Sequence, residues 1–395
     1  MRHLTLTENA PAQPVVLTGA EAEALATTGL AVVTRTPGVA AWQVAAGSKV
    51  GVARVADLQV TVRPKIPVDR LVFLLGYARR PTFWRDQTVL LDVEADLPDA
   101  LAHAFARLAS KALGQGLLQG YTTVDEALPV LRGRLRVGDQ ISRRCGVGLP
   151  LEVTYDEYTV DVAENQLLLA ATHRLLRIPA VSASVRRSLQ RLRLALAGVS
   201  MPTPGLPLPE WRPSRLNIRY QPALHLADLV LAGDSFEQRI GDLRVSGFVV
   251  DMWKVYEDFV CVALSEAIKP FGGRSIQQHP MHLDDDKQVA MRPDFLWRSP
   301  CGPPVVVDAK YKAEKPSGFP QADLYQILAY CTVLGLCEGH LVYAKGNEDE
   351  RVHTVQRAGV RIHVHTLDLA QRPEALLHQV ADLAQTLRQP SATLS

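Results

Sequence analysis

The stretch Val305-Val306-Val307-Asp308-Ala309-Lys310 indicates the fold of the C-terminal third of the chain. Three successive β-branched valines predict a buried strand. Charged residues are unfavourable at the end of such a strand unless they are paired or have a function. Because strand side chains alternate between faces, Asp308 and Lys310 are expected to project in the same direction.

A second acidic residue, Asp294, lies in the segment MRPDF (291–295), within a predicted strand over 289–297. The turn at 299–303 allows this strand to pair with 305–309 as a hairpin, so Asp294 can reach the same place. Two carboxylates can hold one or two Mg²⁺ ions through oxygen ligands, and the Ala309 carbonyl is a candidate further ligand.

Bound Mg²⁺ lowers the pKa of a coordinated water and neutralises charge on a phosphate. A neighbouring ammonium stabilises the developing negative charge. We therefore predict a phosphodiester-cleaving site with Asp294, Asp308 and Lys310 as its core. The alternative is a surface hairpin with an ordinary Asp–Lys ion pair.

From about residue 246 the pattern reads α, β, β, α, β and predicts an α/β domain over 246–395. The predicted helices are 252–268, 322–334 and 373–387, and the predicted strands are 289–297, 305–309, 341–344 and 360–365.

The upstream sequence predicts two further regions, so the chain is expected to be an α+β multidomain protein. Residues 1–88 are predicted to form a β-rich domain, with a capping box at Thr18 and Glu21. Its predicted strands are 41–44, 50–55 and 58–62, with a short helix at 71–77. Residues 89–245 are predicted to be mainly helical, with helices at 100–118, 161–176, 184–196 and 224–231, strand and turn at 120–137, and a proline-rich connector at 201–213.

The formal net charge is only +2, so any nucleic-acid surface must be a local patch. The cysteine count is five, no CxxC pair exists, and no signal peptide is recognised, which favours reduced thiols and a cytoplasmic location. No apolar run has the length of a membrane span. No GxxxxGK[ST] motif is present, so the chain has no P-loop for a nucleotide.

Several other clusters have ordinary structural explanations. Asp284–Asp286 is interpreted as a solvated turn and not a calcium site. His363 and His365 share a strand face, but with no third ligand evident they are placed on an edge strand. Cys331 and Cys337, near His340, are assigned to buried packing. Two groups of arginines could contact phosphate or a partner, or could simply be solvated: Arg174, Arg177, Arg186, Arg187, Arg191 and Arg193 in the middle helices, and Arg132, Arg134 and Arg136 on a predicted strand.

The chain resembles the PD-(D/E)xK nuclease superfamily and, more closely, the McrC family, the nuclease subunit of McrBC-type 5-methylcytosine restriction systems. The most specific matching stretches are MWKVYEDFV (252–260), MRPDF (291–295), VVDAKYK (306–312) and DLYQILAY (323–330). Further similar stretches upstream are VTVRPKI (60–66), LRGRL (131–135) and YDEYTVDVAENQLL (155–168).

The resemblance implies a role for each matching residue. Asp294 and Asp308 would be metal ligands, and Lys310 the catalytic lysine. Glu257 resembles the additional acid that binds metal directly or through water, although a solvated helix residue is the alternative. Gln326 and Tyr330 match a QxxxY signature that positions DNA or the lysine; Tyr330 could instead pack in the core. Lys312 could contact phosphate or be solvated.

The resemblance also implies partners and a cofactor. It implies Mg²⁺, for which Mn²⁺ can substitute, and double-stranded, modified DNA as substrate. Because the chain has no P-loop, the nucleotide-driven subunit would be a separate hexameric AAA+ GTPase of McrB type. The first 245 residues would dock on it and stimulate its GTPase. Two alternatives stay open: a catalytically idle regulatory or scaffold subunit of the same complex, and a stand-alone DNA repair nuclease.

Overall fold

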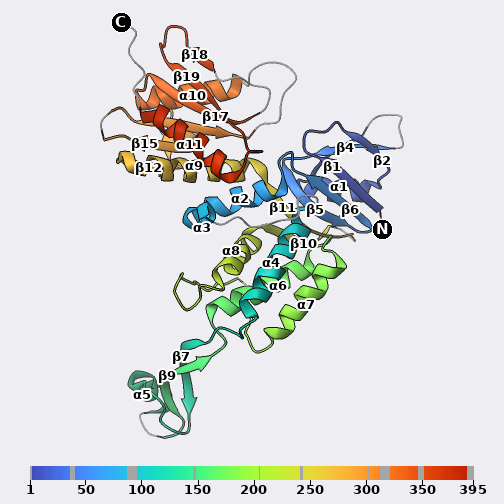
Figure 1. Ribbon diagram of the computed structural model, residues 1–395, viewed down its shortest axis with the longest axis vertical. Helices are drawn as coiled ribbons and strands as arrows, with labels where there is room; N and C mark the ends of the chain where they lie inside the picture. The colour runs from blue at the N-terminus through green and yellow to red at the C-terminus, as the bar shows by residue number, and fades with distance from the viewer. Residues whose placement is uncertain are drawn as a thin grey trace. The chain divides into compact units, whose positions relative to one another are not determined.

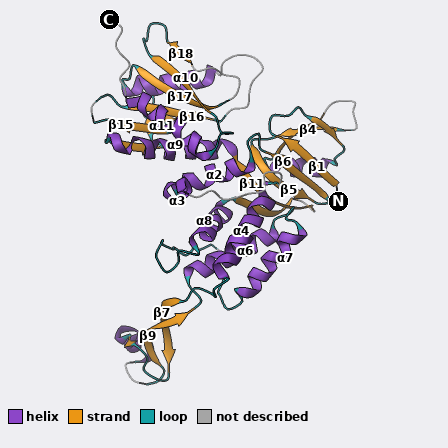
Figure 2. Ribbon diagram, viewed as in Figure 1, coloured by secondary structure: helices purple, strands orange, loops and turns teal. Residues whose placement is uncertain are grey.

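A computed structural model describes residues 2–35, 41–86, 96–145, 148–203, 205–240, 243–300, 302–311, 321–345 and 351–388 (Figure 1). The chain forms two compact units, residues 1–100 with 233–395, and residues 101–232. Helices and strands occur in both units (Figure 2), which agrees with the expected mixed α+β class. The unit boundaries differ from the predicted ones near 88 and 245, because two strands after residue 233 join the N-terminal sheet.

The N-terminal part of the first unit contains two sheets. Its elements are β1 (Arg2–Thr7), β2 (Gln13–Val15), α1 (Gly19–Thr27), β3 (Ala31–Arg35), β4 (Trp42–Ala46), β5 (Lys49–Val55), β6 (Leu58–Arg63), α2 (Val68–Arg79) and α3 (Pro81–Asp86), together with β10 (Asp234–Ile240) and β11 (Leu243–Asp251). The five-stranded sheet has the order β1-β6-β5-β11-β10, and the smaller sheet the order β2-β4-β3. The predicted capping box of α1 is confirmed: the Thr18 hydroxyl accepts from the Glu21 N–H at 3.2 Å, and Glu21 Oε2 accepts from the Thr18 N–H at 2.8 Å.

The C-terminal part of this unit is built on a six-stranded sheet of order β12-β15-β16-β17-β19-β18. Its elements are α9 (Met252–Ile268), the 3-10 turn η1 (Lys269–Phe271), β12 (Arg274–Gln277), β13 (Met281–His282), β14 (Ala290–Met291), β15 (Phe295–Arg298), β16 (Val305–Lys310), α10 (Gln321–Leu334), β17 (Glu338–Ala344), β18 (Arg351–Thr354), β19 (Arg361–Leu367) and α11 (Pro373–Arg388). The hairpin of β15 with β16 is confirmed, and β16, β17 and β19 are parallel.

The predicted strand over 289–297 is wrong in one respect, because it is divided into β14 and β15. The break lies at Arg292-Pro293-Asp294, where proline has no N–H to donate to a ladder. Asp294 therefore lies just before β15 and not within it.

Helix α10 covers the face of the sheet that carries Asp308. This residue pairs in register with Leu341 of β17, so their side chains share a face. Leu341 belongs to a buried cluster with Ile327 and Tyr330 of α10. Gly339 permits the close approach of α10, since a Cβ there would lie 2.6 Å from Cys331 Sγ. Helices α9 and α11 contact the sheet through β16 and β19 respectively (Figure 1).

The second unit contains four long helices and a small sheet. Its elements are α4 (Leu97–Leu113), which begins just before the unit boundary, β7 (Gly120–Leu128), β8 (Arg134–Leu135), α5 (Val137–Arg144), β9 (Leu151–Thr159), α6 (Ala163–Arg177), α7 (Ala183–Ala195) and α8 (Gln221–Ala232). The predicted helices are confirmed, but β9 was not predicted, and it joins β7 and β8 in the order β7-β9-β8. The described part of the connector at 201–213 contains no helix or strand, as expected.

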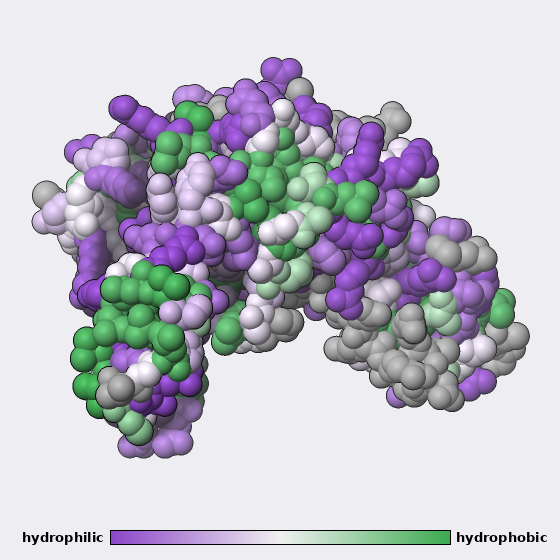
Figure 3. Space-filling view, turned by 90° about the horizontal axis from the view of Figure 1, so that it is seen from below, coloured by the Kyte–Doolittle hydropathy of each residue, from purple (hydrophilic) through white to green (hydrophobic). Residues whose placement is uncertain are grey.

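Exposed apolar side chains are frequent around the small sheet and α5. They are Tyr121, Val130, Leu131, Val137, Ile141, Leu149 and Tyr158. Figure 3 shows that hydrophobic residues on the face in view gather in separate patches among hydrophilic ones. In the part of the chain that the structure describes, we find no helix whose length and apolarity would suit a membrane span.

Candidate functional site

Asp308 and Lys310, at the end of β16, form an ion pair. Lys310 Nζ lies 2.5 Å from Asp308 Oδ2, and the side chains are 20% and 1% exposed. The prediction that both project in the same direction is therefore confirmed. The pair ends an apolar strand, so both charges lie largely out of water.

Asp294 is held against the end of β16. Its carboxylate Oδ2 accepts the backbone N–H of Ala309 at 2.8 Å, and its side chain is buried. The ladder between β15 and β16 ends at the pair Phe295–Val307, one residue before Asp308. The Asp294 carboxylate thus replaces the missing strand partner and reaches the place that the hairpin predicted.

A glutamine links Asp294 to Glu257 of α9. Gln278 Nε2 donates to Asp294 Oδ1 at 3.0 Å and also to Glu257 Oε1. The backbone N–H of Gln278 donates to the Asp294 carbonyl at 3.0 Å. Glu257 is half-buried and directed toward the other acids, so the alternative of a solvated helix residue is wrong. Gln278 was missed, because a polar residue just after a strand gives no signal by itself.

The acids of this site repel one another. Burial first, and then the charge of Asp294, raise the pKa of Asp308 to about 7 and that of Glu257 to about 8. Burial acts to lower the pKa of Lys310, but the charge of Asp308, its hydrogen bond with Lys310 and the charges of Asp294 and Asp323 together raise this pKa. The site therefore gathers more negative charge than its one lysine can balance.

Gln326 and Tyr330 of α10 are connected to each other and to the segment before Asp294. Gln326 Nε2 donates to the Tyr330 hydroxyl at 2.8 Å, and this hydroxyl donates to the Arg292 carbonyl at 3.2 Å. Tyr330 also belongs to the core beneath the sheet. It therefore packs in the core and at the same time holds the backbone next to Asp294.

The donor set suits a hard divalent cation. Both carboxylate oxygens of Asp308 are buried, and among the described residues neither has a hydrogen-bond partner apart from the ion pair with Lys310. Within the same described residues, no three His, Cys, Asp or Glu side chains are grouped so as to hold a metal ion by themselves. Mg²⁺ commonly uses one or two carboxylates together with water and phosphate oxygens, so the arrangement fits it.

The histidine prediction needs a correction. Strand β19, which carries His363 and His365, is interior, because β18 forms the edge. A third histidine, His340 of β17, stacks on both rings at centroid distances of 4.9 and 5.3 Å. Its Nδ1 lies 3.1 Å from His365 Nε2. The spacing along one strand did not reveal His340, because it is brought in by the register of a neighbouring strand.

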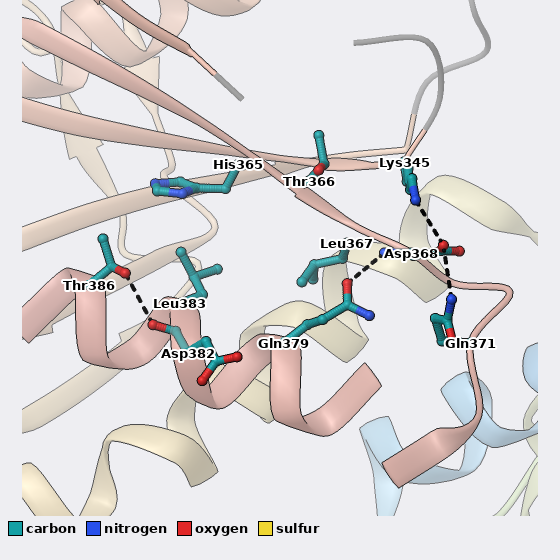
Figure 4. A pocket seen from close by; sticks show the side chains of 10 residues that line it. All are labelled: Lys345, His365, Thr366, Leu367, Asp368, Gln371, Gln379, Asp382, Leu383 and Thr386. Atoms are coloured by element: carbon teal, nitrogen blue, oxygen red, sulfur yellow. Dashed lines mark hydrogen bonds and ion pairs between the residues drawn. The ribbon is translucent and has the colours of Figure 1, made fainter. Parts of the chain in front are cut away.

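A pocket of about 530 Å³ lies between β19 and α11, and His365 is one of its lining residues (Figure 4). Its other lining residues include Lys345, Asp368 and Gln379. Val342, the register partner of His365, faces away from its neighbour Leu341, which shares the face of Asp308. The cavity therefore lies on the opposite face of the sheet from the acid cluster.

The remaining candidates have structural roles or stay untested. Asp284 accepts the N–H groups of Gln288 and Val289 at 3.0 and 2.8 Å, which agrees with a turn. Cys331 is buried as expected, but Cys337 is exposed, so the expectation of buried packing is wrong for Cys337. Lys312 lies outside the described residues, and the Ala309 carbonyl as a ligand stays a prediction.

Four of the nine arginines in the two predicted groups have partners within the chain that argue against simple solvation. Arg174 and Arg186 donate to the carbonyls of Leu231 and Leu176 at 2.8 and 2.6 Å. The Arg132 guanidinium lies 3.9 Å from the centroid of the Tyr155 ring. Arg136 forms ion pairs with Asp125 at 3.4 Å and with Asp139. These four are therefore not simply solvated.

Comparison with known proteins finds one family. The family profile described as "McrBC 5-methylcytosine restriction system component" matches residues 44–344. No curated protein matches the chain significantly. Among solved structures, a chain of a half-complex from a tetradecameric assembly of Thermococcus gammatolerans McrB AAA+ hexamers with bound McrC is similar, with a TM-score of 0.60, 18% identity and coverage of 97% of this chain and 99% of that one. A chain of the cryo-EM structure of the Thermococcus gammatolerans McrBC complex has a TM-score of 0.40 and 19% identity, covering 67% of this chain and 88% of that one.

Proposed function

Because this chain belongs to the family of McrBC 5-methylcytosine restriction system components, we propose that it is the Mg²⁺-dependent DNA endonuclease subunit of such a system. In this proposal, residues 246–395 form a nuclease domain of the PD-(D/E)xK type. The observation that carries it is the convergence of Asp294, Asp308 and Lys310 at the end of β16. A buried acid pair beside one lysine is difficult to explain as a purely structural feature.

Asp294 and Asp308 would hold the cation, with Glu257 acting directly or through water, and Mn²⁺ can substitute for Mg²⁺. When bound, the cation supplies charge for the scissile phosphate and acidifies a water. Lys310 would place its positive charge beside the reacting phosphate. Gln278 would keep the carboxylates of Glu257 and Asp294 oriented toward each other.

The proposed partner is a hexameric AAA+ GTPase of McrB type. The similar assembly from Thermococcus gammatolerans is described as McrB AAA+ hexamers with bound McrC. This chain carries no P-loop motif, so nucleotide-driven movement on DNA would have to come from another chain. We propose that its first 245 residues dock on the ring and stimulate its GTPase, and that the ring selects double-stranded, modified DNA.

The test is cleavage of methylated and unmethylated plasmid by the purified chain, with and without an AAA+ GTPase of McrB type and GTP. The proposal predicts cleavage of methylated plasmid only with Mg²⁺, partner and GTP present. Cleavage by the chain alone, without nucleotide, would favour a stand-alone repair nuclease. GTPase stimulation without cleavage of any modified DNA in Mg²⁺ or Mn²⁺ would favour an idle scaffold subunit.

A further inference from the structure

The residue directly after Lys310 is tied to the N-terminal sheet. The Tyr311 hydroxyl donates to Glu8 Oε2 at 2.9 Å, across 303 residues of sequence. The same carboxylate oxygen accepts the backbone N–H of Lys65 at 3.1 Å. The Lys65 ammonium lies 4.6 Å from the centroid of the Tyr311 ring. One tyrosine thus contacts two segments that follow neighbouring strands, β1 and β6.

Glu8 is itself held in place by the sheet. Its backbone N–H donates to the Arg63 carbonyl at 2.9 Å, which continues the parallel ladder between β1 and β6. The acceptor for Tyr311 therefore belongs to a rigid element and not to a free loop. Burial and the charge of Glu8 raise the pKa of Tyr311, so the hydroxyl keeps the proton that it donates.

The end of β16 needs such an anchor. On one side its last residues have no ladder partner in β15, since that pairing ends at Val307. On the other side the register with β17 ends at the pair Lys310–Tyr343. Beyond this point, Tyr311 supplies the next described contact. Its ring also lies 5.9 Å from that of Tyr256, the neighbour of Glu257 on α9.

We propose that Glu8 and Tyr311 are positioning residues for the nuclease site, which place Lys310 by fixing the backbone that follows it. This inference rests on the proposed nuclease function. It assigns the N-terminal sheet a part in positioning the C-terminal site, in addition to any docking role. Lys65 supports the contact by covering the Tyr311 ring.

The test compares single-turnover cleavage of methylated DNA by the complete complex. Tyr311→Phe removes only the hydroxyl and keeps the ring between Lys65 and Tyr256. We expect the cleavage rate to fall about tenfold, because small displacements of catalytic groups are costly. DNA affinity and GTPase stimulation should stay within about twofold of wild type, since neither needs this hydroxyl.

Three further variants test whether the loss comes from this one hydrogen bond. Glu8→Gln keeps an oxygen acceptor for both donors and should retain most of the rate, whereas Glu8→Ala should lose as much as Tyr311→Phe. The double variant Glu8→Ala/Tyr311→Phe should be no slower than the worse single variant, because both remove one interaction.

Tyr155→Phe is the matched control. Tyr155 also donates to a glutamate, Glu126, at 2.7 Å and also lies under a cation, Arg132, but it belongs to the small sheet of the second unit. A wild-type rate for Tyr311→Phe, an equal loss in Tyr155→Phe, or a loss confined to DNA affinity would overturn the proposal. Absence of cleavage by the wild-type complex would instead refute the proposed function itself.

Discussion

Replacing Asp308 by asparagine is expected to stabilise the metal-free protein while it abolishes cleavage. Asp308 is fully buried, and its pKa is raised from 3.8 to about 7 by burial and by Asp294. At about 1.4 kcal/mol for each pKa unit, the charge of Asp308 lowers the free energy of unfolding by about 4 kcal/mol at a pH above both pKa values, 3.8 and about 7. The amide keeps the volume but still lacks hydrogen-bond donors and leaves Lys310 without its partner. We therefore expect the substitution to recover about half of this, and so to raise the free energy of unfolding by about 2 kcal/mol.

The assay is thermal and urea unfolding at about pH 8 in EDTA, where the carboxylate of wild-type Asp308 is charged. A gain of about 2 kcal/mol should raise the melting temperature by about 5 °C. Asp284→Asn is the control, because Asp284 lies in an exposed turn where backbone N–H groups lower its pKa, and it should give no gain. If Asp308→Asn is less stable than wild type, the carboxylate of Asp308 does not destabilise the metal-free protein, and the proposal is refuted.

Three other predictions concern the surroundings of the site. Burial raises the pKa of Glu257 to about 8 and that of Asp308 to about 7, so the folded protein retains protons that the unfolded chain releases. The free energy of unfolding of the metal-free protein should therefore fall as pH rises from about 4 to about 8. Mg²⁺ should raise the melting temperature more at about pH 8.5 than at about pH 5.5. Tyr330→Phe removes the hydroxyl between Gln326 and the Arg292 carbonyl and should lower the free energy of unfolding by about 1 kcal/mol and slow cleavage; an unchanged cleavage rate would argue against a positioning role. Gly339→Ala should cost about 1–3 kcal/mol in urea unfolding, because its Cβ would meet Cys331 and Ile327 of α10, and unchanged stability would show that the helix can move away.

Local signals in the sequence predicted the elements that carry the site. The run of valines in β16 predicts a strand, and the helical spacing of apolar residues in α9 predicts a helix. Both signals depend on neighbouring residues alone. The alternation of side chains then placed Asp308 beside Lys310, and the hairpin brought in Asp294. Such features need no knowledge of distant parts of the chain.

The features that were missed depend on pairing between distant segments. Strand β11 pairs with β5, about 190 residues earlier in the chain, so the N-terminal sheet could not be completed from local patterns. His340 meets His363 only through the register of β17 with β19. Gln278 joins Glu257 to Asp294 only because α9 lies against the sheet at that point. The break at Pro293 is different, because its signal is local: proline interrupts a ladder wherever it stands.

The most direct test of the central claim is the rate of Mg²⁺-dependent cleavage of methylated DNA by the complete complex, compared between wild type, Asp308→Ala and Lys310→Ala. The account predicts that either substitution slows cleavage by at least about a hundredfold, while folding and stimulation of the partner GTPase stay intact. Undiminished cleavage by both pure variant proteins would contradict it.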